Sequence, residues 1–106
     1  MVDFLNREDA LLLVVDIQER LVPAIHKDLY PRALKNMQIM IETAGTLGLP
    51  ILLTEQYPKG LGPTVQEILR PLEGKQFRRI EKVTFSCARD EGFLQAVATA
   101  HRKQIV

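Results

Sequence analysis

The sequence predicts an α/β domain with an open, mostly parallel sheet and helices on both faces of that sheet. Short apolar runs of the kind that form buried strands occur along the chain, and segments with helical periodicity lie between them. Such alternation is typical of a parallel sheet with right-handed crossover connections. The chain has 106 residues, which is a common size for one domain, so residues 1–106 are expected to form a single unit.

The first strand, helix and second strand are predicted from three consecutive patterns. Residues 10–15 form an unbroken apolar run, as in strands that are buried on both faces. From residue 34 to residue 44, apolar residues recur at spacings of three and four, which indicates an amphipathic helix. Gly45 and Gly48 are expected to end this helix. Residues 51–53 form the next apolar run and predict the second strand.

The following segment is predicted to be a loop over residues 55–64, because it contains two prolines and two glycines. Loops of this length are often functional. One or two helical turns are expected over residues 65–69, ending before Pro71. A third strand is predicted over residues 79–84, and an apolar stripe predicts a helix over residues 90–101.

A fourth strand is predicted to begin at residues 104–106, where the printed sequence ends. A strand that stops as it starts leaves an unpaired apolar edge in the sheet. We therefore expect the domain to be a fragment that is truncated at its fourth strand.

Composition argues against several classes of partner. Fourteen basic and 13 acidic side chains give a net charge of +1, which provides no strong field to hold nucleic acid or an anionic membrane. The longest apolar run covers residues 10–15 and is far too short to span a bilayer. The single cysteine cannot form an internal disulfide. A cytoplasmic protein without nucleic-acid or membrane partners is therefore expected.

Polar residues follow the apolar runs, and open α/β sheets bind ligands at this end of their strands. The residues are Asp16 and Gln18 after the first run, Thr54, Glu55 and Gln56 after the second, and Lys82 and Thr84 after the third. An acid and a lysine in these places can face each other in a cleft with little water, where each stabilises the charge of the other. Such a pair can activate a third group, and a purely structural ion pair is an equally good interpretation.

These polar residues belong to motifs that occur in a fixed order. The motifs are Asp16-Ile17-Gln18, Thr54-Glu55-Gln56-Tyr57-Pro58 with residues 60–64 after it, and Lys82 with Thr84-Phe85-Ser86. In this order they resemble the isochorismatase-like cysteine hydrolases, from about residue 10 to residue 106. The stretch over residues 55–62 is most similar to the isochorismatase-domain-containing branch. The resemblance implies a three-layer, Rossmann-like fold, of which this chain holds the N-terminal part.

In that family an aspartate, a lysine and a cysteine act together, and the resemblance assigns the first two roles to Asp16 and Lys82. The family's cysteine follows the fourth strand, so the nucleophile is expected beyond the printed sequence. A thiol at a helix N-terminus beside a lysine ionises readily, and an acid can pass the thiol proton to a leaving amine. The resemblance therefore implies a hydrolase that acts on a small amide or a related substrate.

Further expectations concern the substrate and the assembly. Gln18, Glu55 and Tyr57 are expected to bind the small-molecule substrate, although Tyr57 and Leu61 are equally suited to pack against a neighbouring subunit. The resemblance also implies a homo-oligomer, and no cofactor is expected. The rival hypothesis is a non-catalytic binding or scaffolding protein that keeps the cleft without the nucleophile.

Other residues with reactive side chains give weaker signals. Cys87 precedes the helix predicted over residues 90–101, but a small, inert thiol is a better interpretation than a nucleophile. His26 and His101 have no second ligand at the spacing of a metal site, so no metal is expected. Residues 59–64 lack the glycine spacing of a phosphate-binding loop.

Overall fold

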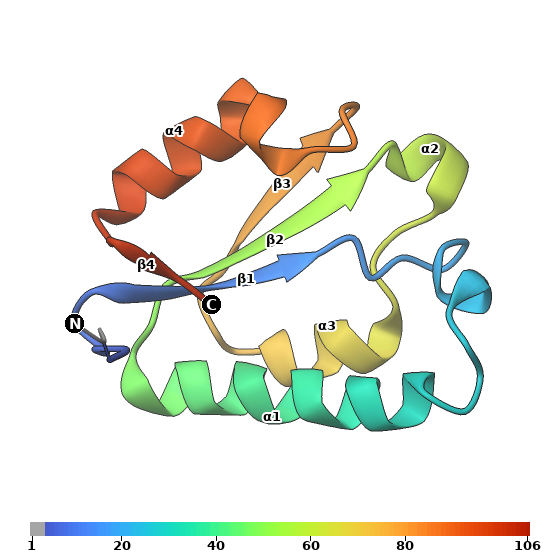
Figure 1. Ribbon diagram of the computed structural model, residues 1–106, viewed down its shortest axis with the longest axis horizontal. Helices are drawn as coiled ribbons and strands as arrows, with labels where there is room; N and C mark the ends of the chain where they lie inside the picture. The colour runs from blue at the N-terminus through green and yellow to red at the C-terminus, as the bar shows by residue number, and fades with distance from the viewer. Residues whose placement is uncertain (1–3) are drawn as a thin grey trace.

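Figure 1 shows a computed structural model of the chain that describes residues 4–106. The sheet has four strands in the order β3-β2-β1-β4, and each neighbouring pair is parallel. The strands are β1 (Ala10–Val15), β2 (Ile51–Gln56), β3 (Arg78–Lys82) and β4 (Gln104–Ile105). The prediction of an α/β fold with a parallel sheet is therefore confirmed.

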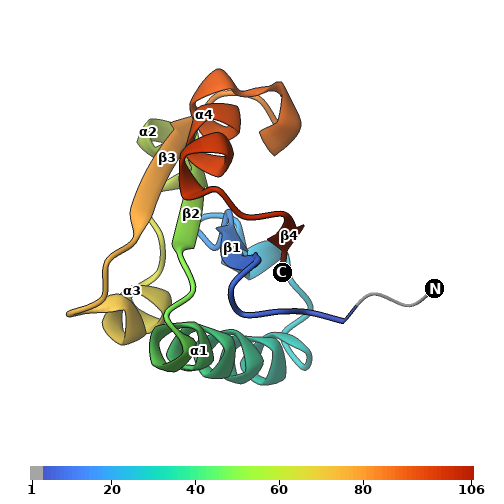
Figure 2. The ribbon, with the colours of Figure 1, turned by 90° about the vertical axis from the view of Figure 1, so that its left-hand side faces the viewer.

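Helices cover both faces of this sheet, as Figure 2 shows. On one face lie α1 (Tyr30–Leu47) and α3 (Gln66–Leu72), and on the other lies α4 (Glu91–Ala100). The short helix α2 (Pro58–Leu61) and the 3₁₀ turns η1 (Val22–Ala24) and η2 (Cys87–Arg89) lie in the connections. None of the helices within residues 4–106 combines the length and the apolar character needed to cross a membrane.

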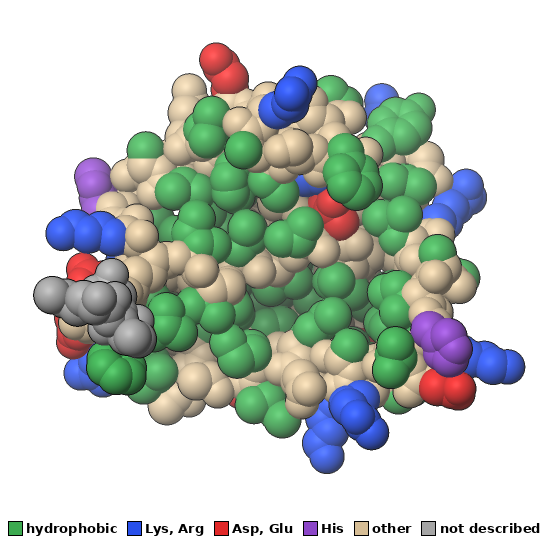
Figure 3. Space-filling view, viewed as in Figure 1, with side chains coloured by type: hydrophobic (Ala, Val, Ile, Leu, Met, Phe, Trp, Pro, Cys, Tyr) green, Lys and Arg blue, Asp and Glu red, His purple; other side chains and the backbone are tan. Residues whose placement is uncertain are grey.

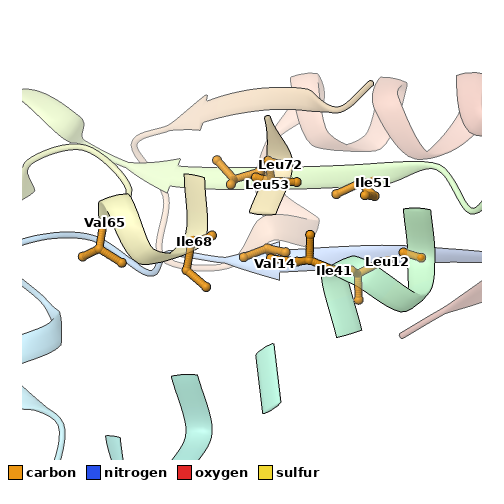
Figure 4. Packing of buried hydrophobic residues seen from close by; sticks show 9 residues of the cluster. Leu12, Val14, Ile41, Ile51, Leu53, Val65, Ile68 and Leu72 are labelled. Carbon is orange, nitrogen blue, oxygen red and sulfur yellow. The ribbon is translucent and has the colours of Figure 1, made fainter. Parts of the chain in front are cut away.

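Two apolar cores lie against the two faces of the sheet. Successive side chains of a strand point to opposite faces, so the apolar runs of β1 and β2 supply both cores. The first core lies between the sheet and helices α1 and α3 (Figure 4) and is built from Leu12, Val14, Ile41, Ala44, Ile51, Leu53, Val65, Ile68 and Leu72. The second core, against α4, is built from Leu11, Leu52, Ile80, Phe93 and Ala96. Burial on both faces explains why these strands are continuous apolar runs.

The strand ends differ from the sequence prediction at the polar residues. β2 continues to Gln56, so Thr54 and Glu55 lie within the strand and not after it. β3 ends at Lys82, and Thr84 lies in the loop that follows. The stretch predicted as one loop over residues 55–64 contains the end of β2 and all of α2. Tertiary contacts bury the polar side chains of β2, and a local sequence pattern does not reveal such contacts.

Helix α3 does not end before Pro71, as predicted, but continues to Leu72. A proline lacks the N–H that would bond to the carbonyl four residues earlier, which is the carbonyl of Glu67. The side chain of Gln38 on α1 compensates, because its Nε2 donates to the Glu67 carbonyl oxygen at 2.9 Å. The contact between α1 and α3 thus allows the helix to include the proline.

Helix α1 begins at Tyr30, earlier than predicted, because Pro31 lies in its first turn, where a missing N–H breaks no hydrogen bond.

The Tyr30 hydroxyl is buried and makes no hydrogen bond within residues 4–106. Burial raises the pKa of Tyr30, and the negative charge of Glu67 raises it further. The folded protein therefore holds this proton at a pH where an unfolded tyrosine has lost it.

Replacing Tyr30 with phenylalanine is expected to reduce the loss of stability at alkaline pH. As the pH rises above about 10, the unfolded tyrosine ionises before the folded one, so proton loss favours unfolding of the wild type. The phenylalanine variant lacks this effect and is expected to gain up to about 1 kcal/mol at neutral pH, because a buried hydroxyl without a partner is removed. Urea unfolding of both proteins between pH 7 and pH 11 measures the difference. If the free energy of unfolding fell with pH equally in both proteins, the raised pKa of Tyr30 would be contradicted as the cause of the loss.

The short strand β4 borders the N-terminal half of β1. It pairs with Ala10 and Leu11, and the N–H of Leu13 donates to the Val106 carbonyl oxygen at 2.8 Å. Past this pairing, a groove of about 500 Å³ runs between β1 and α1 and is lined mainly by apolar side chains. Figure 3 shows hydrophobic side chains across the hollow in the middle of this face.

Candidate active site

The carboxyl ends of β1 and β3 bring Asp16 and Lys82 into direct contact. Lys82 Nζ donates to Asp16 Oδ2 at 2.8 Å, although β2 lies between the two strands. The Lys82 side chain is completely buried, whereas the Asp16 side chain remains 14% exposed. The expectation that an acid and a lysine meet at this edge of the sheet is therefore confirmed, and only the acid is open to solvent.

The loop after β3 surrounds the ammonium group of Lys82. Besides Asp16 Oδ2, Lys82 Nζ donates to the carbonyl oxygens of Thr84 at 3.2 Å and Phe85 at 3.1 Å. An ammonium group has three N–H donors, so all three have acceptors. These contacts stabilise a charge that burial alone would penalise strongly, and they fix its position beside the carboxylate.

The backbone of Asp16 has an unusual conformation, which directs its side chain. Its φ of 55° lies in the left-handed region, which costs a non-glycine residue about 1 kcal/mol or more. Thr54 holds the residue there, because Thr54 Oγ1 donates to Asp16 Oδ1 at 2.7 Å and the Asp16 N–H donates to the Thr54 carbonyl oxygen at 3.2 Å. Each carboxylate oxygen of Asp16 thus has one donor.

Gln18 connects the segment after β1 to the end of β2 and to the following loop. Its side chain is completely buried. Gln18 Nε2 donates to the carbonyl oxygens of Gln56 at 2.9 Å and Gly62 at 2.8 Å, and the Gln56 N–H donates to Gln18 Oε1 at 2.7 Å. Both amide donors of Gln18 are therefore used by the backbone, and contact with a substrate stays a prediction for this residue.

Glu55 holds the same loop at Thr64. Its carboxylate is buried, and Oε2 accepts hydrogen bonds from the Thr64 N–H at 2.8 Å and the Thr64 hydroxyl at 2.7 Å. Arg79 Nε lies 3.9 Å from the same oxygen and compensates the buried negative charge. The observed contacts of Glu55 stabilise the loop, so its expected part in substrate binding also stays a prediction.

Tyr57 lies where β2 turns into α2. Its φ is 39°, and its N–H donates to the Lys82 carbonyl oxygen at 2.8 Å, which ties the turn to β3. The aromatic ring lies over Gly60, where a Cβ atom would be 2.5 Å from Tyr57 Cε2, so a larger residue at this position would displace the ring. The Tyr57 side chain is 55% exposed, and both expected roles, in substrate binding and in subunit contact, remain predictions.

Three contacts of this site were not predicted from the sequence. The hydroxyl of Thr54 bonds to Asp16, Arg79 neutralises Glu55, and the backbone of residues 84 and 85 accepts from Lys82. A threonine inside an otherwise apolar strand is a signal that a buried hydroxyl has a partner. The backbone contacts leave no such signal in the sequence.

The remaining candidate residues lie outside the cluster around Asp16. Cys87 begins η2 and packs, partly buried, against the second core, which suits a structural thiol. His26 lies on the surface with its Nδ1 3.9 Å from Asp28 Oδ2. Among residues 4–106, no group of three or more His, Cys, Asp and Glu side chains is arranged to hold a metal ion.

Comparison with known proteins identifies the family. The family model described as the isochorismatase domain matches residues 10–106. The chain is 40% identical over 79 residues to isochorismatase domain-containing protein 2A of Mus musculus, and 35% identical over 88 residues to isochorismatase family protein 1A of Dictyostelium discoideum. These alignments cover 74% and 82% of this chain, but they span 35% and 42% of the two relatives.

Solved structures agree with this match. The MAR1 ribonuclease from Caenorhabditis elegans has a TM-score of 0.81 to this chain at 27% identity. The YcaC gene product from Escherichia coli, described as an octameric hydrolase of unknown specificity, has a TM-score of 0.74 at 26% identity. Each comparison covers 95% of this chain and 50% of the other. Because the family model matches nearly the whole sequence, the chain belongs to the isochorismatase family.

Proposed function

We propose that the whole protein is a hydrolase that cleaves a small amide, or a related small substrate, with Asp16, Lys82 and a cysteine that lies beyond residue 106. The observation that carries this proposal is the 2.8 Å contact between Lys82 Nζ and Asp16 Oδ2. A completely buried ammonium beside a partly exposed carboxylate is a combination suited to proton transfer at the carboxylate. Residues 1–106 supply one part of the single domain in which this chemistry takes place.

In the proposed reaction, the cysteine thiol transfers its proton to Asp16 and its sulfur attacks the amide carbon. The carbon–nitrogen bond breaks, the proton on Asp16 passes to the leaving amine, and a thioester remains. Water then attacks the thioester, with Asp16 taking a proton from the water and returning it to the sulfur. Asp16 suits this shuttle because its carboxylate keeps lone pairs beside the two hydrogen bonds that fix it.

Lys82 contributes through its charge. Because its three donors already have acceptors, it does not need a bond to the substrate to stay in place. A fixed positive charge near the sulfur favours the thiolate over the thiol. In a site with little water, this electrostatic effect is larger than it would be in solution.

The assembly and the location of the protein are part of the same proposal. The octameric state of the YcaC gene product supports a homo-oligomer, in which the exposed Tyr57 ring would contact a substrate or a neighbouring subunit. The proposed location is the cytoplasm, where thiols, including that of the proposed nucleophile, stay reduced. The substrate is proposed to be a small molecule.

A substrate screen tests the proposed activity. The longest natural form of the protein is incubated with a panel of small primary amides, and ammonia release is measured. We expect at least one amide to release ammonia at a rate proportional to the protein concentration. Binding of panel members without turnover, by protein whose fold is verified, would favour the rival hypothesis of a non-catalytic binding protein.

Replacing Cys87 with alanine is expected to leave this turnover within about twofold of the wild-type value, because the thiol packs against the second core and such thiols are inert. In the longest natural form, with the modified residue identified by peptide mass spectrometry, we expect the Cys87 thiol to react more slowly with a disulfide reagent at pH 7 than it does after unfolding in urea. Loss of all turnover in the alanine variant would instead identify Cys87 as the nucleophile.

A further inference from the structure

Thr54 is a buried polar residue of β2 whose hydroxyl has one partner, the carboxylate of Asp16. We propose that Thr54 is a positioning residue: its hydroxyl holds Asp16 Oδ1, so that Oδ2 faces Lys82 and the carboxylate keeps the orientation needed for proton transfer. The part of this inference that concerns turnover rests on the proposed function. The part that concerns the orientation of the carboxylate does not.

The geometry ties Asp16 to Thr54 at two points. The hydroxyl of Thr54 lies 2.7 Å from Asp16 Oδ1, and the Thr54 carbonyl oxygen accepts from the Asp16 N–H at 3.2 Å. Parallel pairing places Thr54 beside Val15, the residue before Asp16. The backbone and the side chain of Asp16 are therefore both fixed by one residue of the neighbouring strand β2, at a position where φ is 55°.

The hydroxyl of Thr54, and not its methyl group, is the part that acts on Asp16. Thr54 is completely buried, so water does not replace a missing hydroxyl at low cost. Lys82 alone bonds to Oδ2, and a carboxylate held at one oxygen can rotate about its Cβ–Cγ bond. With a donor on each oxygen, the plane of the carboxylate is fixed.

Two substitutions separate the hydroxyl from the shape of the side chain. Thr54→Val keeps the shape and removes the donor, whereas Thr54→Ser keeps the donor and removes a methyl group. If Thr54 only fills space, valine is tolerated and serine is disruptive. If Thr54 positions Asp16, the order is reversed. Thr43→Val is the matched control, because the Thr43 hydroxyl donates to the Ile39 carbonyl oxygen at 2.7 Å on an exposed part of α1.

The first readout is independent of turnover and uses NMR spectroscopy of the longest natural form of the protein at pH 7. We expect the side-chain carboxyl ¹³C signal of Asp16 and the ¹⁵Nζ signal of Lys82 to shift or broaden in Thr54→Val. Both signals are expected to stay near their wild-type positions in Thr54→Ser and Thr43→Val. Unchanged signals in Thr54→Val, or larger changes in Thr54→Ser than in Thr54→Val, would overturn the proposal.

The second readout is turnover of the substrate found in the amide screen. We expect Thr54→Val to lower kcat by roughly 10- to 100-fold with KM nearly unchanged, as for a misplaced catalytic group, and Thr54→Ser to restore most of the loss. A loss of kcat in both variants would overturn the role of the hydroxyl. If no substrate is turned over, the proposed function fails, and the NMR readout still decides whether Thr54 positions Asp16.

Discussion

Replacing Asp16 with asparagine is expected to lower kcat for amide hydrolysis by about 10²- to 10⁴-fold, the usual contribution of a general acid or base. An asparagine amide cannot take the proton of the thiol. Its oxygen can still accept a hydrogen bond from Lys82, and its shape is nearly that of aspartate. The expected loss is therefore one of proton transfer and not of architecture.

The same variant is expected to lose some stability. Lys82 is completely buried, and in the variant its charge keeps the two backbone carbonyl acceptors but loses its anionic partner. We expect the free energy of unfolding to fall by about 1–3 kcal/mol, less than for a buried pair without other contacts. Urea unfolding measures the fall, and ammonia release measures kcat.

Asp28→Asn is the matched control, because the Asp28 side chain is 80% exposed and lies on the surface beside His26. It is expected to match the wild type in both measurements. If kcat in Asp16→Asn equals the wild-type value, Asp16 takes no part in proton transfer, and its contact with Lys82 is a structural ion pair.

Replacing Gln18 with methionine is expected to destabilise the protein by about 3–5 kcal/mol, because three hydrogen bonds to buried or partly buried backbone groups are lost together. Methionine has a similar volume to glutamine, so the cost comes from the unsatisfied groups and not from a cavity. The segment of residues 61–65 loses one of its side-chain contacts. The free energy of unfolding in urea is the first measurement.

Amide hydrogen exchange gives a local measurement for the same variant. The Gln56 N–H donates to the Gln18 side chain, so we expect its exchange to speed up more than that of the Leu53 N–H in the middle of β2. Gln95→Met on the exposed side of α4 is the control and is expected to change neither quantity. Equal protection of Gln56 in the variant and the wild type would show that the side chain of Gln18 does not hold this strand end.

The centre of the sheet was predictable because β1 and the first half of β2 are apolar runs, whereas β3 is mostly charged. The meeting of Asp16 with Lys82 was predictable from the places of these residues at the carboxyl ends of two strands. The ends of the strands were less predictable. Thr54 and Glu55 are polar and look like loop residues, but Thr54 bonds to Asp16 and Glu55 to Thr64. Asp16 lies 38 residues from Thr54, and Thr64 lies nine residues from Glu55 across a loop, so neither partner follows from the periodicity of the strand.

The roles of Gln18 and Glu55 show a similar limit. A polar residue after a buried strand indicates a ligand site only in general terms, and it does not distinguish a group that touches substrate from one that holds a loop. In the structure, the amide of Gln18 and the carboxylate of Glu55 both bond to the chain itself. The distinction depends on how residues 61–65 pack against residues 17–20, the segment after β1, which is a property of the tertiary fold.

The loop that surrounds the Lys82 ammonium makes its contacts through main-chain carbonyl oxygens. Two of its side chains are directed outward, since Val83 and Phe85 are 81% and 88% exposed. Evolution can exchange the side chains at these two positions without altering the electrostatics of the buried cation. The surface of this loop can thus vary while the contact between Lys82 and Asp16 is inherited unchanged.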